Sequence, residues 1–192
     1  HRGVDTAIFD PSSVTQYRII REAERLNLPE DDYIVMLPGR PTSWKGHEVL
    51  IHAVAALKRL DVTLLLLGAG DGSPRFVAGL EHLARKTGLD GRLRIAASSD
   101  DMPSALMLAD VIAMPSIVPE PFGRVAVEAG AMGRPIVAFN HGGAIESVLN
   151  GQTGWLAEPR DIADLSNALG KALDLSQAKR SKLAKKARAH II

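Results

Sequence analysis

The feature that most constrains this chain is an alternation, from about residue 33 onward, between short apolar runs and segments of helical periodicity. The apolar runs cover residues 33–37, 62–67, 93–96, 111–114, 135–139 and 154–157. Between them, apolar residues recur at the spacing of one helix face in residues 49–57, 76–84 and 162–173. Parallel strands need a crossover connection, which is usually a helix. The alternation therefore predicts the α/β class: a doubly wound parallel sheet of about six strands with helices on both faces.

The length of 192 residues fits a single domain. We expect residues 1–15 to form a linker, because they show no long period, and residues 16–192 to form the domain. The absence of cysteine rules out a disulfide framework and a cysteine nucleophile. Apolar stretches such as residues 64–67 are too short to cross a bilayer, and no signal-peptide pattern opens the sequence. A cytoplasmic location is therefore the expectation.

Charge is almost balanced over the whole chain but concentrated at its end. The formal net charge of +1 gives no general reason to expect nucleic acid as a partner. Residues 171–192, however, hold seven basic residues and one acidic residue. Two interpretations stay open for this tail, a solvated helix and a peripheral contact of the whole protein with an anionic membrane. The thin apolar stripe favours the solvated helix; it consists of Leu175, Ala178, Leu183 and Ala187.

Four loops follow predicted strands and should share one edge of the sheet. In doubly wound sheets ligands bind beyond the carboxyl ends of the strands. The loops at residues 39–46, 68–73, 97–101 and 115–123 should therefore line a single rim. We expect the chemistry of the protein to take place there.

The first of these loops carries Arg40 and Lys45 just ahead of a predicted helix. Two cations beside the free N–H groups of a helix N-terminus suit a diphosphate, although loops also carry such residues for solubility. The loop does not match the P-loop pattern, because Lys45 precedes Gly46. Hydrolysis of ATP at a P-loop is therefore not expected.

The second loop reads Gly68-Ala69-Gly70-Asp71-Gly72 and resembles half of a dinucleotide fingerprint. Its third glycine is misplaced for G-x-G-x-x-G, and this disfavours a hydride-transfer enzyme. The glycines favour close approach of a ligand to the backbone, with a tight strand-to-helix turn as the alternative.

Two glutamates in and after the loop at residues 115–123 carry the strongest signal. Glu120 lies in the loop, and Glu128 follows on a helix predicted to begin near Phe122. The two carboxylates can face one crevice, because about two helical turns at most separate them. Carboxylates suit sugar or ribose hydroxyls, and the amides left bare beside Gly123 suit a phosphate. Glu128 is the only charged residue within residues 125–131, which favours a functional role over a solvated charge.

The sequence around these glutamates resembles a known family. From Pro115 it reads P-S-x3-E-P-F-G-R-x3-E-A-x-A-M-G-x-P-I-V-A, followed by G-G-A-I-E at residues 142–146 and G-Q-T-G-W-L at residues 151–156. These motifs are similar to those of the retaining glycosyltransferases of the GT-B fold, family 4. Gly3-Val4-Asp5, Phe9-Asp10-Pro11, the Arg40 loop and the Gly70 loop follow the family's order and spacing. The resemblance covers nearly the whole chain.

The resemblance implies one half of a two-domain enzyme. Such proteins place two Rossmann-like domains around a cleft, and the match begins where the second, donor-binding domain does. The acceptor-binding N-terminal domain would then be a partner missing from this chain, which alone would be inactive. The expected whole enzyme transfers a sugar from a nucleotide-diphosphate sugar to an acceptor, in cell-envelope glycolipid or polysaccharide synthesis.

The resemblance also implies roles for individual residues. Arg40 and Lys45 would neutralise the diphosphate, and Glu128 would accept hydrogen bonds from the ribose. Glu120, the catalytic candidate, would hold hydroxyls of the transferred sugar, while the leaving phosphate accepts the acceptor's proton in a front-face attack. The remaining donor-binding positions would be Phe122, Gly123 and Arg124 near the sugar and phosphate, and Gly70, Ile95 and Ala96 beside the base.

No cofactor and no metal ion are expected, because the fixed cations would replace a divalent metal. His141 is expected to be an exposed loop residue and not a catalytic one. Two other classes of function stay open: a non-catalytic module that binds nucleotide sugars, and a GT-B relative such as an epimerase or a phosphorylase. The glutamate motif argues against the latter two enzymes.

Overall fold

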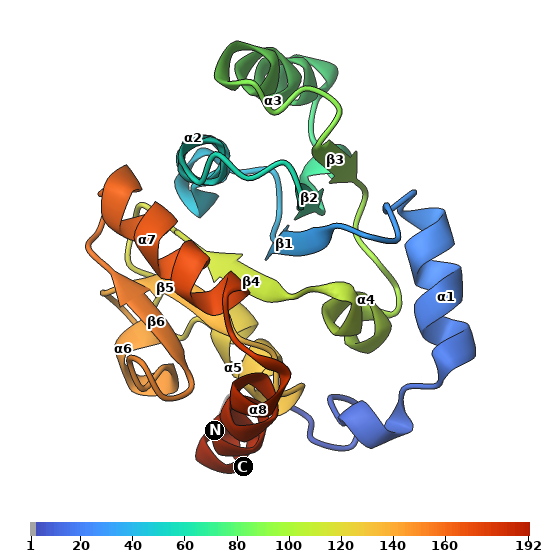
Figure 1. The fold of residues 1–192 in the computed structure, drawn as a ribbon, viewed down its shortest axis with the longest axis vertical. Coiled ribbons are helices and arrows are strands. Elements are labelled where there is room, and N and C mark those ends of the chain that lie inside the picture. Colours follow the sequence, from blue (N-terminus) through green and yellow to red (C-terminus); the bar gives the residue numbers. More distant parts are fainter. Residues whose placement is uncertain (1–2) are drawn as a thin grey trace.

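The computed structural model describes residues 3–192 and contains one six-stranded, wholly parallel sheet (Figure 1). The strand order is β3-β2-β1-β4-β5-β6. The strands are β1 (Tyr33–Pro38), β2 (Val62–Leu67), β3 (Leu93–Ala96), β4 (Val111–Met114), β5 (Ile136–Phe139) and β6 (Gly154–Ala157). The predicted class is confirmed. The predicted first strand ended one residue early and the fifth began one residue early.

Eight α-helices connect and flank the strands within the described residues. They are α1 (Gln16–Arg25), α2 (His47–Ala56), α3 (Pro74–Thr87), α4 (Met102–Leu108), α5 (Arg124–Ala131), α6 (Ala144–Ser147), α7 (Ile162–Leu173) and α8 (Gln177–Ile191). Three short 3-10 turns are η1 (Pro11–Ser13), η2 (Ser43–Lys45) and η3 (Ala69–Asp71). Ser73 and Asp101 cap α3 and α4 with their side chains.

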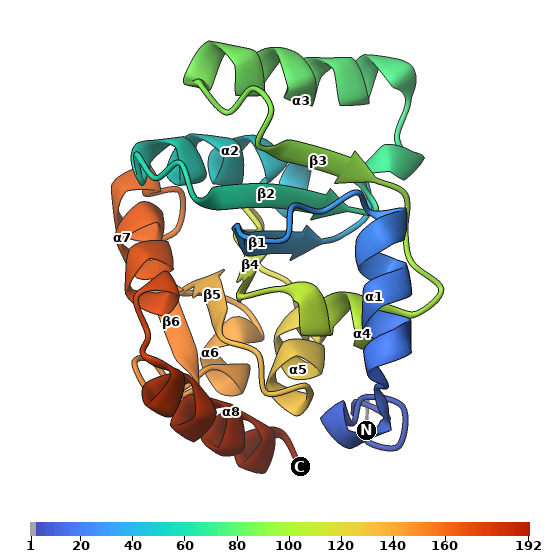
Figure 2. The ribbon, with the colours of Figure 1, turned by 45° about the vertical axis from the view of Figure 1, so that its right-hand side comes forward.

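The helices form one layer on each face of the sheet (Figures 1 and 2). Along β1, Val35 and Leu37 join a buried cluster with residues of α2, α3 and α7. Ile34 and Met36 point the other way, into a cluster with residues of α4 and α5. Side chains alternate between the two faces of a strand, so a continuous apolar run is required when both faces are covered. The strand sequences are therefore continuously apolar because helices cover both faces of the sheet.

The segment before α1 lies against the domain. Residues 1 and 2 of the predicted linker fall outside the described residues, whereas Phe9 and Val14 pack on the second core cluster. Arg188 of α8 donates a hydrogen bond to the Phe9 carbonyl over 3.0 Å and lies 3.1 Å from the Asp10 carboxylate. The described part of this segment is therefore fixed to α8.

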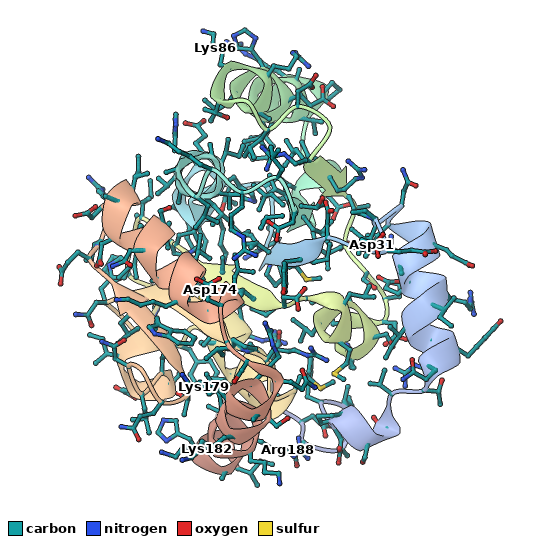
Figure 3. All side chains as sticks on the ribbon, in the orientation of Figure 1. Asp31, Lys86, Asp174, Lys179, Lys182 and Arg188 are labelled. Carbon is teal, nitrogen blue, oxygen red and sulfur yellow. The ribbon has the colours of Figure 1, made fainter. Side chains whose placement is uncertain are left out.

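The basic tail forms the last turn of α7 and the whole of α8. Figure 3 labels three of its basic residues on α8, Lys179, Lys182 and Arg188. Two residues of the predicted stripe, Leu183 and Ala187, are buried, and α8 packs against α5. The stripe is thus a packing contact. None of the helices in residues 3–192 has the length and apolar character that a membrane crossing requires.

Candidate functional site

The loops that follow β1, β2 and β4 pack directly on one another at the carboxyl edge of the sheet. Gly46 has a positive φ of 80°, and a Cβ there would lie 2.0 Å from the carbonyl oxygen of Pro115. A Cβ at Gly68 would lie 2.8 Å from the carbonyl oxygen of Gly39. Real side chains do not approach so closely, so glycine is required for these loops to meet. The single rim predicted from the sequence is present.

An open cavity of about 760 Å³ lies at this rim. Two segments form its walls, the loop before α2 and the loop that leads into α5. Its lining residues are Arg40, Trp44, Lys45, Val118, Pro119, Glu120, Pro121, Phe122, Gly123, Arg124 and Val125. The cavity therefore brings together six of the ten residues that the sequence predicted for the site.

An ion pair between Lys45 and Glu120 spans the cavity wall. The Nζ atom of Lys45 lies 2.7 Å from Oε1 of Glu120, and each side chain is 13% exposed. The ammonium group also lies 4.6 Å from the centre of the Trp44 ring, a cation–π contact. The hydroxyl of Ser116 donates a hydrogen bond to the same Oε1 atom. The pair is thus screened from water on several sides and is stronger than an exposed pair.

Arg40 lies exposed at the cavity mouth and makes no ion pair among the described residues. Its neighbour across the cavity is the start of α5, where Gly123 takes a left-handed φ of 70° before the helix begins at Arg124. The first N–H groups of an α-helix have no acceptor within the helix. A free guanidinium and free amide donors at one opening provide an anion site. The helix begins two residues later than predicted because of the Gly123 turn.

Glu128 faces an adjacent pocket of about 230 Å³ instead of the large cavity. Phe122 and Arg124 line both spaces, so the pocket adjoins the large cavity. Burial raises the pKa of Glu128, against the opposing effect of Arg124, whose Nη2 lies 3.0 Å from Oε1. Lys45 acts on the same carboxylate through its charge. That the two carboxylates face one crevice stays a prediction, and the structure places them in adjoining pockets.

Gly70 and Ile95 do not line the large cavity. A Cβ at Gly70 would lie 2.6 Å from the carbonyl carbon of Ala96, so loop packing explains the missing side chain. Ile95 packs against the core cluster on the α3 side and lines a separate pocket there. The sequence correctly placed the end of this strand at the rim, but the alternation of side chains along β3 turns Ile95 away.

Three residues of the site were missed in the sequence or assigned another role. Trp44 lies beneath Lys45, and Ser116 is 2% exposed and bonded to Glu120. His141 is half-buried, and its Nε2 lies 2.7 Å from the Ser116 carbonyl oxygen, which corrects the expectation of an exposed residue. The position of Ser116, two residues after the end of a strand and four residues before Glu120, was a signal that could have found it.

Within residues 3–192, no three side chains among histidine, aspartate and glutamate gather closely enough to hold a metal ion. The absence of a metal requirement stays a prediction.

A family model described as "Glycosyl transferases group 1" matches residues 19–190 of this chain. The chain belongs to this family. Proteins of known structure share its fold: a Rickettsia africae glycosyltransferase superposes with a TM-score of 0.94 at 31% identity, over 100% of this chain and 51% of that chain. The Anabaena protein HepE, solved with UDP and glucose, gives 0.85 at 31% identity, over 97% of this chain and 50% of that chain. The sheet and its helices are thus one half of a GT-B fold.

Two curated relatives carry the name D-inositol 3-phosphate glycosyltransferase. The protein from Salinispora tropica is 36% identical over 98% of this chain and 41% of its own length. The protein from Xylanimonas cellulosilytica is 37% identical over 97% of this chain and 45% of its own length. The group 1 chain described here therefore spans less than half the length of these relatives.

Proposed function

We propose that this chain is the donor-binding half of a retaining glycosyltransferase that uses a nucleoside-diphosphate sugar. The observation that carries the proposal is the cavity in which Arg40, Lys45 and the start of α5 face one opening, with Glu120 on its wall. Cations and free helix amides attract a diphosphate, and a carboxylate accepts hydrogen bonds from sugar hydroxyls. All of these groups lie at the sheet edge where doubly wound proteins bind ligands.

The diphosphate is the leaving group on this proposal. Negative charge develops on it as the bond to the sugar breaks, and Arg40 and Lys45 stabilise that charge. The transfer needs no divalent metal, because these two cations take its part. The leaving phosphate accepts the acceptor's proton, so the acceptor attacks on the face the nucleotide leaves and configuration is retained.

The two glutamates divide the donor between them. Glu120 holds hydroxyls of the transferred sugar, and Glu128, in the adjoining pocket, accepts hydrogen bonds from the ribose. The separation of the two pockets by Phe122 and Arg124 supports this division. The HepE structures that hold UDP or UDP-glucose support a nucleotide sugar as the donor. The acceptor is held by the other half of the enzyme, and we place the whole enzyme in cell-envelope glycolipid or polysaccharide synthesis.

Calorimetry with UDP-, GDP- and ADP-sugars, in buffer that contains EDTA, tests the proposal. One base should bind, and ligand at about a hundred times Kd should add about 2.7 kcal/mol to the free energy of unfolding. The double variant Arg40→Ala/Lys45→Ala should lose at least tenfold in affinity, since a hydrogen bond to a charged group contributes about 1.5–3 kcal/mol. The charge-matched control is Lys86→Ala/Lys182→Ala, two exposed lysines outside the cavity. Equal affinity in both double variants would exclude the diphosphate assignment.

A further inference from the structure

The Oε1 atom of Glu120 has two partners that differ in kind. One is the mobile, charged end of Lys45, 2.7 Å away. The other is the hydroxyl of Ser116, a residue that is 2% exposed and lies two positions after the end of β4. Lysine reaches Glu120 through a flexible four-carbon stem, whereas the serine hydroxyl is fixed to the backbone at a strand end. The carboxylate is therefore anchored by Ser116 and neutralised by Lys45.

The backbone that carries Ser116 and Glu120 rests on the loop after β5. Nε2 of His141 lies 2.7 Å from the carbonyl oxygen of Ser116, so this nitrogen carries the proton and donates it. The His141 ring packs edge-on against Phe139, which is fully buried in the core. The N–H of Gly143 donates to the carbonyl oxygen of Glu120 over 2.8 Å. The loop after β5 thus holds both ends of the segment from Ser116 to Glu120.

The same loop leaves no space for this segment to move toward it. A Cβ at Gly142 would lie 2.4 Å from the Glu120 carbonyl oxygen, and one at Gly143 would lie 2.3 Å from the Phe122 carbonyl oxygen. Contact at this closeness between two backbones defines the position of the Glu120 loop. The remaining freedom of Glu120 lies in its side chain, which Ser116 restricts.

Binding of a diphosphate changes which of the two donors, Lys45 or Ser116, holds the Oε1 atom of Glu120. Lys45 cannot serve the carboxylate and the phosphate equally, because the diphosphate carries more negative charge and accepts the same donors. Once Lys45 turns toward the phosphate, repulsion from that anion pushes Glu120 away from the cavity. A neutral hydroxyl donor is unaffected by this exchange. It keeps the carboxylate on the cavity wall where the sugar arrives.

We propose that Ser116 and His141 are positioning residues for Glu120: they hold its carboxylate in place when Lys45 transfers to the donor diphosphate. Ser116 acts on the side chain directly, and His141 acts through the backbone of Ser116. This inference rests on the proposed function, because it assumes that Lys45 meets a phosphate and that Glu120 meets the sugar.

The experiment compares two ligands that differ by the sugar alone. Calorimetry on the 192-residue chain measures Kd for UDP and UDP-glucose, for GDP and GDP-mannose, and for ADP and ADP-glucose. The quantity of interest is the ratio of the two dissociation constants within the pair that binds. In Ser116→Ala this ratio should shift about tenfold against the sugar nucleotide, the low end for a hydrogen bond to a charged group. The Kd of the free diphosphate should stay within twofold.

Variants of His141 separate a lost hydrogen bond from general damage. His141→Phe keeps the ring and removes the N–H donor, so it should shift the same ratio, by less than Ser116→Ala. His141→Gln retains an N–H donor and should restore part of the ratio. A thermal unfolding curve is measured for every variant, because a purely structural role would lower the melting temperature and leave the ratio unchanged.

Two control variants remove the same kinds of hydrogen bond elsewhere. Thr63→Val removes a buried hydroxyl that bonds Asp32 over 2.6 Å at the opposite edge of the sheet. His190→Phe removes a histidine whose Nε2 lies 2.9 Å from the Glu146 carbonyl oxygen on α6. Both should leave the ratio unchanged.

The outcomes separate the inference from the proposed function. If Ser116→Ala weakens the diphosphate and the sugar nucleotide equally, or neither, the positioning role is wrong while nucleotide binding stands. If the wild-type chain binds none of the six ligands, the proposed function fails and the role of Ser116 fails with it.

Discussion

At the scale of single residues, the properties of the site depend on which counter-ion each charged side chain can pair with. Lys45 has two possible counter-ions, the Glu120 carboxylate 2.7 Å away and an arriving phosphate. Glu128 has the exposed Arg124 as its neighbour, and burial raises the pKa of Glu128. Residues of the same type, a few positions apart, therefore have different environments and different expected roles.

Replacing each glutamate by glutamine tests this difference. Glu128→Gln should weaken binding of the nucleoside diphosphate, because the ribose belongs to the nucleotide. Glu120→Gln should leave that affinity unchanged or slightly tighter, since it frees Lys45, and should lower sugar transfer in a protein of the relatives' full length. Calorimetry gives the affinities, and transfer of labelled sugar gives the rate. Equal losses of diphosphate affinity in the two variants would contradict the division.

His47, the first residue of α2, makes stability depend on pH. It is 2% exposed, and neither ring nitrogen has a hydrogen-bond partner among the described residues. Burial lowers the pKa of His47 from 6.5 to about 4. Below pH 6.5 the unfolded chain therefore binds a proton at His47 that the folded chain does not bind. The contribution of neutral His47 to the free energy of unfolding is fully present above pH 6.5 and is lost as the pH falls toward 4.

The loss between pH 7 and pH 5 should be about 2 kcal/mol in the free energy of unfolding. His47→Phe should remove this dependence, because phenylalanine fills a similar volume against Phe76 and cannot take up a proton. Urea unfolding of both proteins at the two pH values measures the effect. His52→Phe, an exposed histidine on the same helix, is the control and should keep the pH dependence. A wild-type slope that survives in His47→Phe would assign it to another group.

At the scale of elements, α8 stabilises the ends of two other helices. Arg180 donates to the carbonyl of Asp110, just after α4, over 2.7 Å, and Arg188 donates to the carbonyl of Ala131, the last residue of α5, over 2.6 Å. Cations near a helix C-terminus interact favourably with its exposed carbonyls. Part of the basic charge of the tail thus has an internal structural use that neither interpretation from the sequence included.

Arg188→Met should lower the free energy of unfolding by about 2 kcal/mol, since two carbonyl bonds and the Asp10 ion pair are lost together. Lys182→Met, on the exposed side of the same helix, should change it by less than about 0.5 kcal/mol (Figure 3). Chemical denaturation of the two variants measures the difference. Similar stabilities would show that α8 is held by its apolar stripe alone.

At the scale of the whole molecule, every residue role proposed here concerns binding of the sugar donor, and none concerns binding of the acceptor. The chain covers 41% and 45% of the two curated relatives, and its cavity is open to solvent. Positioning of two reactants can account for about 7–11 kcal/mol of a barrier. A site that binds the donor alone cannot lower the barrier by positioning the acceptor.

The purified 192-residue chain should therefore bind the donor nucleotide and show no sugar transfer above background. Labelled sugar incorporation into a mixed acceptor pool measures transfer, with a full-length group 1 relative as the positive control. Robust turnover by the chain alone would show that the acceptor site lies within it. Donor binding by a full-length protein that never transfers would instead support a non-catalytic binding module.

The sequence by itself determined the class of fold and the bounds of four of the six strands. Strands β2, β3, β4 and β6 have the predicted bounds, because a strand buried on both faces must be apolar throughout and that requirement is written locally. The loops with Arg40, Lys45 and Glu120 were likewise found in the sequence, since each follows a strand and all strand ends of a parallel sheet meet at one edge.

Only the tertiary structure decided which of these groups touch. Lys45 pairs with Glu120 across 75 positions of sequence, Ser116 joins them, and His141 supports Ser116 from another strand. The tertiary structure also decided on which face of the sheet Ile95 lies and that Glu128 lines an adjoining pocket. Periodicity reports the local conformation of a segment, whereas contacts between loops depend on strand order, on register and on backbone approaches such as that of Gly46 to Pro115.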